Sequence, residues 1–424
     1  MDSDRIAGVR HPLGGQTLRA FRTEGFWRIW AGSMFWYSAR WMDLFVLQWQ
    51  VLVLTDSAFQ VTLIGFYRMV PMFFFGLLTG LVADHVDRRK VLLCTQLWNA
   101  AVSASIGVLA LTGQLALWHL AILVTALGFS WAVDMPSRRS AVYDMMGPRG
   151  VVNAMALDHL GMDGAKMIGP LLGGLLWPVI GAGGCLLILA VGYLVNFCIY
   201  LGLPPFPPVR SAGSTPVLRN LVEGFAYVIR NPVILAVLAI TAVMNLLGFP
   251  YQNMVPVVAK KVLDLGPQLT GLLLAADGFG AMVAAIIIAS RRDVMHKGRV
   301  FALGSLCTMV GVFAFSFSRS YLLSFALLFV AGCGMACFAT LQSSLILLSA
   351  SDTMRGRTMG TLILAIGFGP LGAIQIGALA LALGAPLAIT MTAGTGILLL
   401  ALLAWKSRAL WELGIGKQRN RMLP

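Results

Sequence analysis

The sequence predicts an all-helical integral membrane protein with twelve transmembrane helices arranged as two pseudo-symmetric six-helix bundles. Hydrophobic residues make up 58% of the 424 residues and charged residues only 11%, unlike the composition of a soluble globular chain. The apolar residues fall in blocks of about 20, the length that a helix needs to cross about 30 Å of hydrocarbon. Continuous apolar runs of this kind exclude a β-barrel, whose strands alternate in hydropathy.

The apolar blocks form two series of six predicted spans. The first series covers residues 27–53, 61–83, 91–112, 115–136, 157–178 and 184–203. The second series covers residues 233–255, 268–290, 299–317, 322–349, 358–383 and 386–405. The stretch between them is polar and rich in proline, which cannot continue a helix. We therefore expect an N-terminal bundle in 1–203, a cytoplasmic linker in 204–232, and a C-terminal bundle with a cytoplasmic tail in 233–424.

The net charge of +14 reflects membrane topology and not a nucleic-acid interface. If the N-terminus is cytoplasmic, nearly all Arg and Lys residues of the loops lie on the cytoplasmic side, and the opposite side has only Lys260, Lys261 and Arg319. This asymmetry obeys the positive-inside rule and predicts that both termini are cytoplasmic. Residues 1–25 lack the apolar core of a signal peptide. We expect a multi-pass protein of the cytoplasmic (inner) membrane with no nucleic-acid partner.

The sequence does not predict an enzyme, because no polar segment is long enough to form a catalytic domain. No phosphate-binding loop, HExxH pair or nucleophile elbow is placed to support catalysis inside the membrane. The six cysteines lie in apolar spans without metal-ligand spacing. We therefore expect no metal and no cofactor.

Two landmarks recur in both halves and indicate duplication of a six-helix unit. Gly169-Pro170 in the fifth span corresponds to Gly369-Pro370 in the eleventh. The basic turn at 88–90 after the second span corresponds to the turn at 291–292 after the eighth. Parallel repeats of this kind are common in transporters.

The turn after the second span reads Gly80-Leu-Val-Ala-Asp84-His-Val-Asp-Arg88-Arg89-Lys. Gly80 would let two helices approach closely, and Asp84 lies at a helix end where its charge needs a partner such as Arg88. The stretch resembles the loop signature of the major facilitator superfamily. This resemblance implies a charge cluster that latches one conformation and joins the turn to an acid of the fourth span, here Asp134. The alternative is a topogenic basic turn with incidental acids.

The fifth span contains a second motif, Gly169-Pro170-Leu-Leu-Gly173-Gly174. Proline bends a helix and frees a carbonyl, and small residues let a neighbouring helix pack on the bend. The stretch resembles the antiporter motif of drug-efflux facilitators, and a plain packing kink is the alternative. Together the motifs resemble the bacterial efflux branch of the superfamily, which includes the enterobactin exporter and macrolide-efflux proteins. The resemblance implies proton-driven export by alternating access.

Ionisable side chains within the predicted spans are candidates for proton coupling, because a charge in hydrocarbon is costly. Arg40 and Asp43 lie at i and i+3 in the first span, and Asp163 and Lys166 repeat this spacing in the fifth. Side chains at this spacing share a helix face and can partly neutralise each other. Asp277 in the eighth span has no local partner. Asp43 would bind a proton when Arg40 moves away, and the alternative is a static ion pair that fixes helix packing. For Asp163, Lys166 and Asp277 the alternative is a role in contacts between helices.

Other residues of the spans are candidates for lining a substrate cavity between the halves. Tyr37 and Trp41 lie near the centre of the first span and could stack on a planar substrate, with lipid-facing packing as the alternative. The polar candidates are Gln48, Arg68, Asn245, Gln252 and Gln342. Arg68 has no local partner, and for the amides the alternative is hydrogen bonding between helices.

The sequence thus predicts a transporter that exports a small amphipathic molecule, such as a drug-like compound or a siderophore, by proton-coupled alternating access. The expected partners are the substrate, protons and the lipid bilayer, and we expect a monomer. A metabolite importer or uniporter of the same fold and a transport-inactive membrane sensor are the alternatives.

Overall fold

The computed structural model describes residues 20–21, 23, 25–206, 217–290, 296–351 and 354–411. This part of the chain contains helices and no strand. The N-terminal half consists of α2 (Phe26–Thr55), α3 (Ala58–His85), α4 (Arg88–Leu111) and α5 (Leu117–Leu201). The C-terminal half begins with α7 (Pro232–Val243), the π-helix η2 (Met244–Gly248), α8 (Tyr251–Lys261), α9 (Pro267–Ser290) and α10 (Lys297–Phe315). It continues with α11 (Tyr321–Ser349), α12 (Arg355–Ile366), α13 (Gly369–Leu383), α14 (Ala385–Lys406) and α15 (Arg408–Trp411).

The long element α5 contains three predicted spans, and two glycines interrupt it. Gly147 and Gly181 have φ of 63° and 67° with ψ of 179°, a conformation that glycine adopts at little cost because it has no Cβ. The chain turns back at Gly181, and the segment after it packs on α4. A Cβ on Gly183 would lie 2.8 Å from the carbonyl oxygen of Gly107, so the two helices cross almost backbone to backbone.

Prolines explain two breaks in the C-terminal half. The predicted span 233–255 divides into α7, η2 and the start of α8, and Pro250 stands at the N-cap of α8. The predicted span 358–383 divides into α12 and α13, with Pro370 in the first turn of α13. Proline has no backbone N–H, so the preceding turn of each helix loses a hydrogen bond at this point.

Ten helical stretches of the described residues are long and apolar enough to cross a membrane. The stretch Asn153–Leu201 is counted once, although it contains two predicted spans and the break at Gly181. The ten stretches do not include α2. The polar residues Arg40, Asp43 and Gln48 interrupt the apolar sequence of this helix. Large apolar side chains cover the exterior, and Leu322, Leu398 and Trp405 are each more than 70% exposed.

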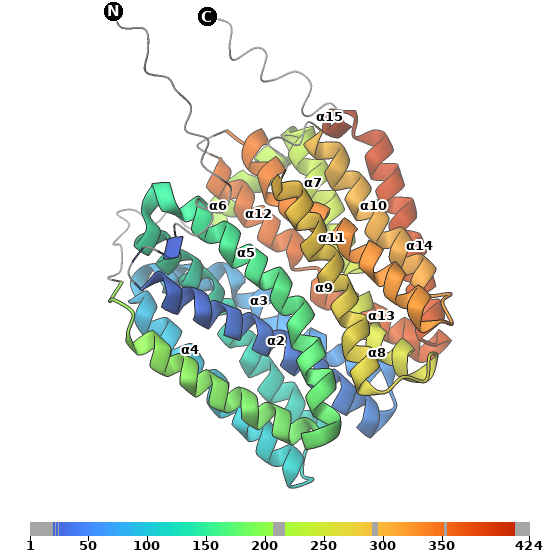
Figure 1. The fold of residues 1–424 in the computed structure, drawn as a ribbon. Helices are drawn as coiled ribbons and strands as arrows, with labels where there is room; N and C mark the ends of the chain where they lie inside the picture. Colours follow the sequence, from blue (N-terminus) through green and yellow to red (C-terminus); the bar gives the residue numbers. More distant parts are fainter. Residues whose placement is uncertain are drawn as a thin grey trace, which may run out of the picture.

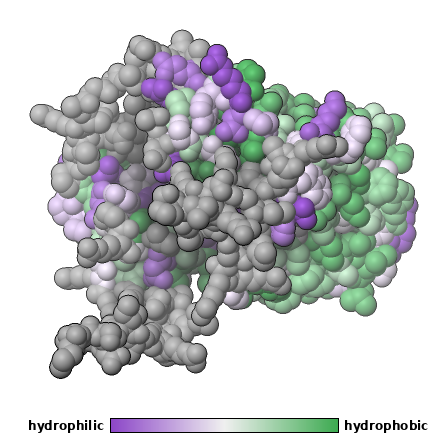
Figure 2. Space-filling model, turned by 90° about the horizontal axis from the view of Figure 1, so that it is seen from above, coloured by the Kyte–Doolittle hydropathy of each residue, from purple (hydrophilic) through white to green (hydrophobic). Residues whose placement is uncertain are grey.

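The two halves of the chain lie side by side (Figure 1). The blue-to-green helices α2–α5 form one bundle, and the yellow-to-red helices α7–α14 form the other. Helix α6 (Val217–Arg230) lies in the predicted linker and contacts α12, where Glu223 forms an ion pair with Arg357. Figure 2 shows hydrophilic residues gathered on one end of the molecule and apolar residues on its flank.

Glycines bring the two halves into close contact along two helix pairs. A Cβ on Gly271 of α9 would lie 2.3 Å from the carbonyl oxygen of Pro170 in α5. A Cβ on Gly377 of α13 would lie 2.1 Å from the hydroxyl oxygen of Thr62 in α3. Helices approach this closely only where small residues leave the backbone uncovered.

Candidate functional site

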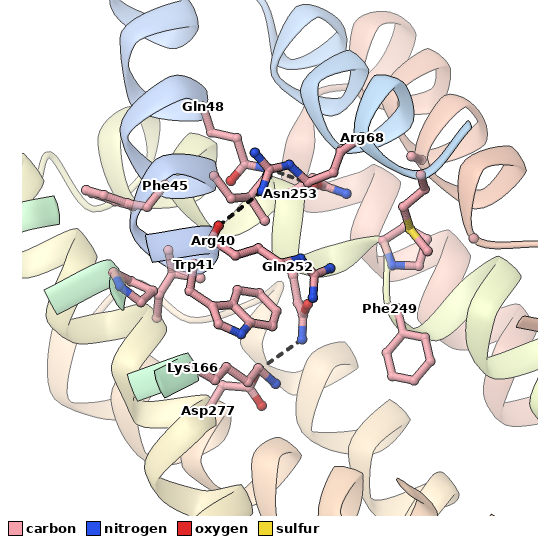
Figure 3. Close-up of a pocket in the computed structure, with 18 of the residues that line it drawn as sticks. Arg40, Trp41, Phe45, Gln48, Arg68, Lys166, Phe249, Gln252, Asn253 and Asp277 are labelled. Carbon is pink, nitrogen blue, oxygen red and sulfur yellow. Dashed lines mark hydrogen bonds and ion pairs between the residues drawn. The ribbon is translucent and has the colours of Figure 1, made fainter. Parts of the chain in front are cut away.

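A cavity of about 250 Å³ lies between the two halves (Figure 3). Its N-terminal wall comes from α2, α3 and α5, and its C-terminal wall from η2, α8, α9, α11 and α13. The lining residues are Arg40, Trp41, Leu44, Phe45, Gln48, Gly65, Arg68, Met69, Lys166, Pro170, Asn245, Phe249, Pro250, Gln252, Asn253, Leu274, Asp277, Met335, Gly369 and Ala373. Most of this surface is apolar, with a few polar and charged groups, which is typical of a small-molecule site.

An ion pair joins the two halves at the cavity wall. Lys166 Nζ on α5 lies 2.6 Å from Asp277 Oδ2 on α9, and Gln252 on α8 donates a hydrogen bond of 3.1 Å to the same oxygen. Lys166 and Asp277 are 9% and 2% exposed. Lys166 therefore forms its ion pair with Asp277 and not with Asp163, and Asp277 has a partner that its own span does not provide. Helices α5 and α9 cross at Gly278, where a Cβ would lie 2.8 Å from the backbone nitrogen of Met167.

A second buried ion pair lies within the N-terminal half. Arg68 Nη2 on α3 is 2.8 Å from Asp43 Oδ1 on α2, and the two residues are 4% and 1% exposed. Arg68 Nη1 also donates to the carbonyl oxygen of Arg40 at 3.2 Å. The predicted pairing of Asp43 with Arg40 is therefore wrong, because Arg68 reaches across from the next helix. Arg68 lines the cavity, and Asp43 lies behind it.

The guanidinium of Arg40 lies against aromatic rings. Its guanidinium carbon lies 3.6 Å from the ring centroid of Trp131 on α5 and 5.6 Å from that of Trp41. Such cation–π contacts hold a guanidinium without neutralising it. The Nζ atom of Lys166 lies 5.7 Å from the centroid of Trp41, so this ring stands between the two cations (Figure 3). Trp131 could not be predicted as a site residue, because a tryptophan in the fourth span carries no signal of its own.

Amides from both halves meet on another wall of the cavity. Gln48 of α2 donates a hydrogen bond of 2.6 Å to Asn253 of α8 (Figure 3). Asn245 and Gln252 also line the cavity, as predicted for both. Asn253 was not identified from the sequence, although it directly follows Gln252.

Besides Asp43, the candidates Tyr37, Gln342 and Asp163 lie outside the cavity lining. Tyr37 donates a hydrogen bond of 2.9 Å to the Asp158 carboxylate, and Gln342 donates one of 2.8 Å to the hydroxyl of Thr241. Both contacts hold helices of the same half together, which is the alternative stated for Gln342. Asp163 lies one turn before Lys166 and has no ion pair among the described residues.

The glycines of the fifth-span motif are contact points for other helices. A Cβ on Gly169 would lie 2.5 Å from the Cβ of Trp41, and one on Gly173 would lie 2.9 Å from the ring of Phe45. A Cβ on Gly174 would lie 2.5 Å from the carbonyl oxygen of Pro267 in the other half. Pro170 itself lines the cavity. The non-helical dihedral angles of α5 occur at Gly147 and Gly181 and not at this motif.

The predicted charge cluster is arranged differently from the expectation. Asp134 on α5 accepts hydrogen bonds from Arg138, one turn later on the same helix, and from Thr95 at 2.7 Å. Arg88 instead forms an ion pair with Asp144. The predicted contact between Arg88 and Asp134 is therefore wrong, because each has a nearer partner.

Arg89, another member of the predicted cluster, has a partner at the end of α5. Arg89 donates to the carbonyl oxygen of Leu201. Gly80 and Asp84 belong to residues 76–85, whose side chains lie outside the described part of the chain.

Arg138 is the centre of a buried network that the sequence analysis did not identify. It is 2% exposed, and Asp134 is 0% exposed. Its guanidinium donates to the hydroxyl oxygens of Ser33, at 3.0 Å, and of Tyr200. One arginine thus connects α2 with two distant segments of α5.

Another ion pair joins the halves at the end of the molecule where α2 and α8 finish. Lys261 Nζ donates to the Asp56 carboxylate at 2.9 Å and to the Asp56 carbonyl oxygen at 2.6 Å. Lys260 donates to the carbonyl oxygen of Leu52 at 3.2 Å. The hydrogen bond from Lys261 holds the pKa of Asp56 below its usual value. Two lysines of one half therefore cap a helix end of the other half.

The chain is similar to known membrane transporters along nearly its whole length. A family model described as transmembrane secretion effector matches residues 16–416. Enterobactin exporters of Escherichia coli O127:H6 (strain E2348/69 / EPEC) and of Escherichia coli O1:K1 / APEC are 24% identical over 360 residues, covering 84% of this chain and of each exporter. These relatives are transporters and not enzymes.

Solved transporter structures share the fold. A bacterial homolog of the human lysosomal transporter Spinster, in an inward-facing and unoccupied conformation, superposes with a TM-score of 0.72 at 15% identity, covering 93% of this chain and 97% of that one. A nucleoside transporter superposes with a TM-score of 0.75 at 14% identity, covering 90% and 99%.

Proposed function

This chain belongs to the transmembrane secretion effector family of the major facilitator superfamily, and we propose that it exports a small amphipathic molecule by proton-coupled alternating access. The predicted membership of this superfamily is confirmed by the family match. Similarity to enterobactin exporters supports the export direction. A drug-like compound or a siderophore is the proposed kind of substrate.

We infer twelve membrane passes from ten spanning stretches. At 1.5 Å per residue, the 49 residues of Asn153–Leu201 would be about 74 Å long, more than twice the hydrocarbon thickness. The break at Gly181 supports two passes in this stretch. Helix α2 has 30 residues, and its buried Asp43 is paired with Arg68, which supports a further pass. In this topology both termini are cytoplasmic, the bundles are 1–203 and 233–424, and the membrane is the cytoplasmic (inner) membrane.

The cavity between the halves is the observation that carries the proposal. Both halves contribute to its lining, so a rocking motion of one half against the other changes the shape of the site and its access to each side. The contact of Asp56 with Lys261 closes one end of the molecule across the halves. This arrangement supports a state in which the cavity is shut toward that end, as alternating access requires.

The buried ion pairs support proton coupling. Lys166 and Asp277 belong to different halves, so the rocking motion separates them and leaves a carboxylate without its cation. An isolated carboxylate in apolar surroundings favours its neutral form. Asp43 with Arg68 offers the same chemistry within one half. We propose Asp43 and Asp277 as proton carriers, and Asp163, which has no ion-pair partner in the described part of the chain, as the weaker candidate.

Two experiments test this function in sequence. Cells with and without the protein are compared by untargeted analysis of the small molecules that they retain, and the strongest candidate is then assayed in proteoliposomes. An exporter coupled to protons accumulates the compound against its gradient when the lumen is acidic, and nigericin abolishes the accumulation.

The same assay separates the alternatives. A uniporter equilibrates the compound without accumulating it, and an importer moves it in the opposite direction relative to the proton gradient. A membrane sensor binds the compound and gives no flux, which would contradict transport altogether. Liposomes without protein are the control for passive leakage.

A further inference from the structure

Three cations and one carboxylate, Asp277, line the cavity, and a second carboxylate, Asp43, lies behind Arg68. Arg40, Arg68 and Lys166 all line it. Asp43 neutralises Arg68 at 2.8 Å, and Asp277 neutralises Lys166 at 2.6 Å. Arg40 has no carboxylate partner among the described residues, and its Nε atom is buried without a hydrogen bond.

This unpaired charge is held in position by its surroundings. The guanidinium lies 3.6 Å from the Trp131 centroid and 5.6 Å from that of Trp41, so its orientation is fixed by two rings. Aromatic faces attract a cation but supply no counter-charge, and a charge in an apolar site remains unfavourable until an anion pairs with it. The fold therefore keeps a positioned cation at the edge of a cavity whose other two lining cations are each paired with a carboxylate.

We propose that the transported molecule is an organic anion with a planar ring, whose single acidic group binds Arg40. The proposal rests on the proposed function, because it concerns the same cavity. A guanidinium binds a carboxylate or sulfonate through two parallel hydrogen bonds, which gives both charge and orientation. A monoanion matches the one excess positive charge.

The rings around Arg40 define where the apolar part of such a molecule lies. Trp41 stands between Arg40 and Lys166, and Phe249 forms part of the opposite wall contributed by the C-terminal half (Figure 3). Leu44 and Met69 extend the apolar surface. A planar ring attached to the acidic group therefore stacks on aromatic side chains while its charge meets the guanidinium.

The test uses a matched pair of fluorescent compounds, 1-anilinonaphthalene-8-sulfonate and its uncharged parent N-phenyl-1-naphthylamine. Their saturable binding to the full-length protein is measured in lipid nanodiscs, with empty nanodiscs subtracted. We expect Arg40→Gln to weaken sulfonate binding at least about tenfold and to change binding of the uncharged parent less than about twofold. Arg40→Lys keeps the charge without the planar fork and should recover part of the loss.

Arg319→Gln is the matched control, since it removes an exposed arginine outside the cavity, and it should bind both compounds like the wild type. Thermal unfolding of each variant verifies that it is folded, and Arg40→Lys provides the test if Arg40→Gln does not fold. Equal effects of Arg40→Gln on both compounds, or no effect on either, would overturn the proposal. A wild type that binds only the uncharged parent, or neither compound, would overturn it as well.

Flux of the same two compounds distinguishes this proposal from the proposed function. Sulfonate binding that depends on Arg40 without any flux in proteoliposomes contradicts transport and leaves the anion site standing. Flux of both compounds that is independent of Arg40 supports transport and contradicts the anion site.

Discussion

Lys166 and Asp277 face each other across the boundary between the two halves, with 2.6 Å between the ammonium nitrogen and a carboxylate oxygen. A buried ion pair contributes little net stability, because the cost of removing both charges from water offsets their attraction. Losing only one partner is costly, since the other charge then stays buried alone. The pair is thus suited to hold one conformation and to be broken in another.

The first prediction concerns the free-energy cost of leaving one charge of this ion pair buried without its partner. Asp277→Asn should lower the free energy of unfolding by about 3–5 kcal/mol, because it leaves Lys166 unpaired. The double variant Lys166→Met/Asp277→Asn should be more stable than Asp277→Asn alone, since no charge remains. Denaturant unfolding of the wild type, Asp277→Asn, Lys166→Met and the double variant measures the coupling energy between the two charges. Additive effects of the two changes would show that the charges do not interact.

A second prediction follows from the crossing of α5 and α9. Gly271→Ala places a Cβ 2.3 Å from the Pro170 carbonyl oxygen, so the halves should separate at this end and the cavity should open there. In a cysteine-free background, spin labels at Ser57→Cys and Asp264→Cys should report a longer distance. Gly164→Ala is the control, because a Cβ there would meet nothing within 4 Å. Unchanged distances in Gly271→Ala would contradict the proposed closure.

The third prediction uses the same pair of labels to follow Asp56 and Lys261. Because Lys261 holds the pKa of Asp56 below its usual value of about 3.9, the carboxylate stays ionised as pH falls from 7 to 5. The contact is present above the usual pKa and is lost only as pH falls through the lowered pKa. The label distance should therefore not change between pH 7 and 5.

Salt and mutation supply the controls for this contact. Asp56 is 70% exposed, so 1 M salt should screen the interaction and lengthen the label distance. Asp56→Asn should lengthen it at every pH. A distance that lengthens already at pH 5 in the wild type would show that another group controls this end.

Ten spanning stretches of the described residues were predictable because each contains a continuous apolar run that needs no partner to be recognised. Gly181, Pro250 at the N-cap of α8 and Pro370 in the first turn of α13 mark where those runs break. Residues of the cavity were partly predictable as well, since a charge or amide in an apolar span is conspicuous. Arg40, Lys166 and Asp277 were identified in this way.

The partners of these charges could not be predicted from one sequence. Spacing of i and i+3 suggested Asp43 with Arg40, but Arg68 reaches Asp43 from the neighbouring helix. A local spacing rule cannot anticipate such contacts, because they depend on how helices are rotated about their axes and packed. Trp131 was missed because a tryptophan in an apolar span carries no signal of its own. Asn253 was missed although it is an amide in a predicted span, directly after Gln252.

The fourth prediction separates two charge clusters that the sequence analysis combined. Asp134→Asn should destabilise the fold by about 3–5 kcal/mol, because it leaves the buried Arg138 without its carboxylate. Arg88→Ala removes a different ion pair, with Asp144. The effects of Arg88→Ala and Asp134→Asn on unfolding should therefore add within about 0.5 kcal/mol. Strong coupling between these two changes would restore the predicted single cluster.

The last prediction is that Asp43 carries the coupling proton, with Arg68 as the cation that controls it. In the structure Arg68 lies 2.8 Å from the Asp43 carboxylate and supplies its counter-charge. When rearrangement of α3 removes Arg68, the buried carboxylate binds a proton instead. Asp43→Asn mimics the protonated acid permanently. It should abolish accumulation driven by a pH gradient while preserving exchange of labelled for unlabelled substrate, because exchange needs no net proton movement.

Asp163→Asn is the matched control for this experiment, since it also removes a carboxylate from a span but breaks no ion pair of the described residues. It should accumulate substrate like the wild type. The ratio of gradient-driven flux to exchange is the decisive quantity, because a folding defect lowers both fluxes and a coupling defect lowers only the first. If Asp43→Asn keeps the wild-type ratio, Asp43 is not the coupling site, and Asp277 becomes the better candidate because its cation lies in the other half.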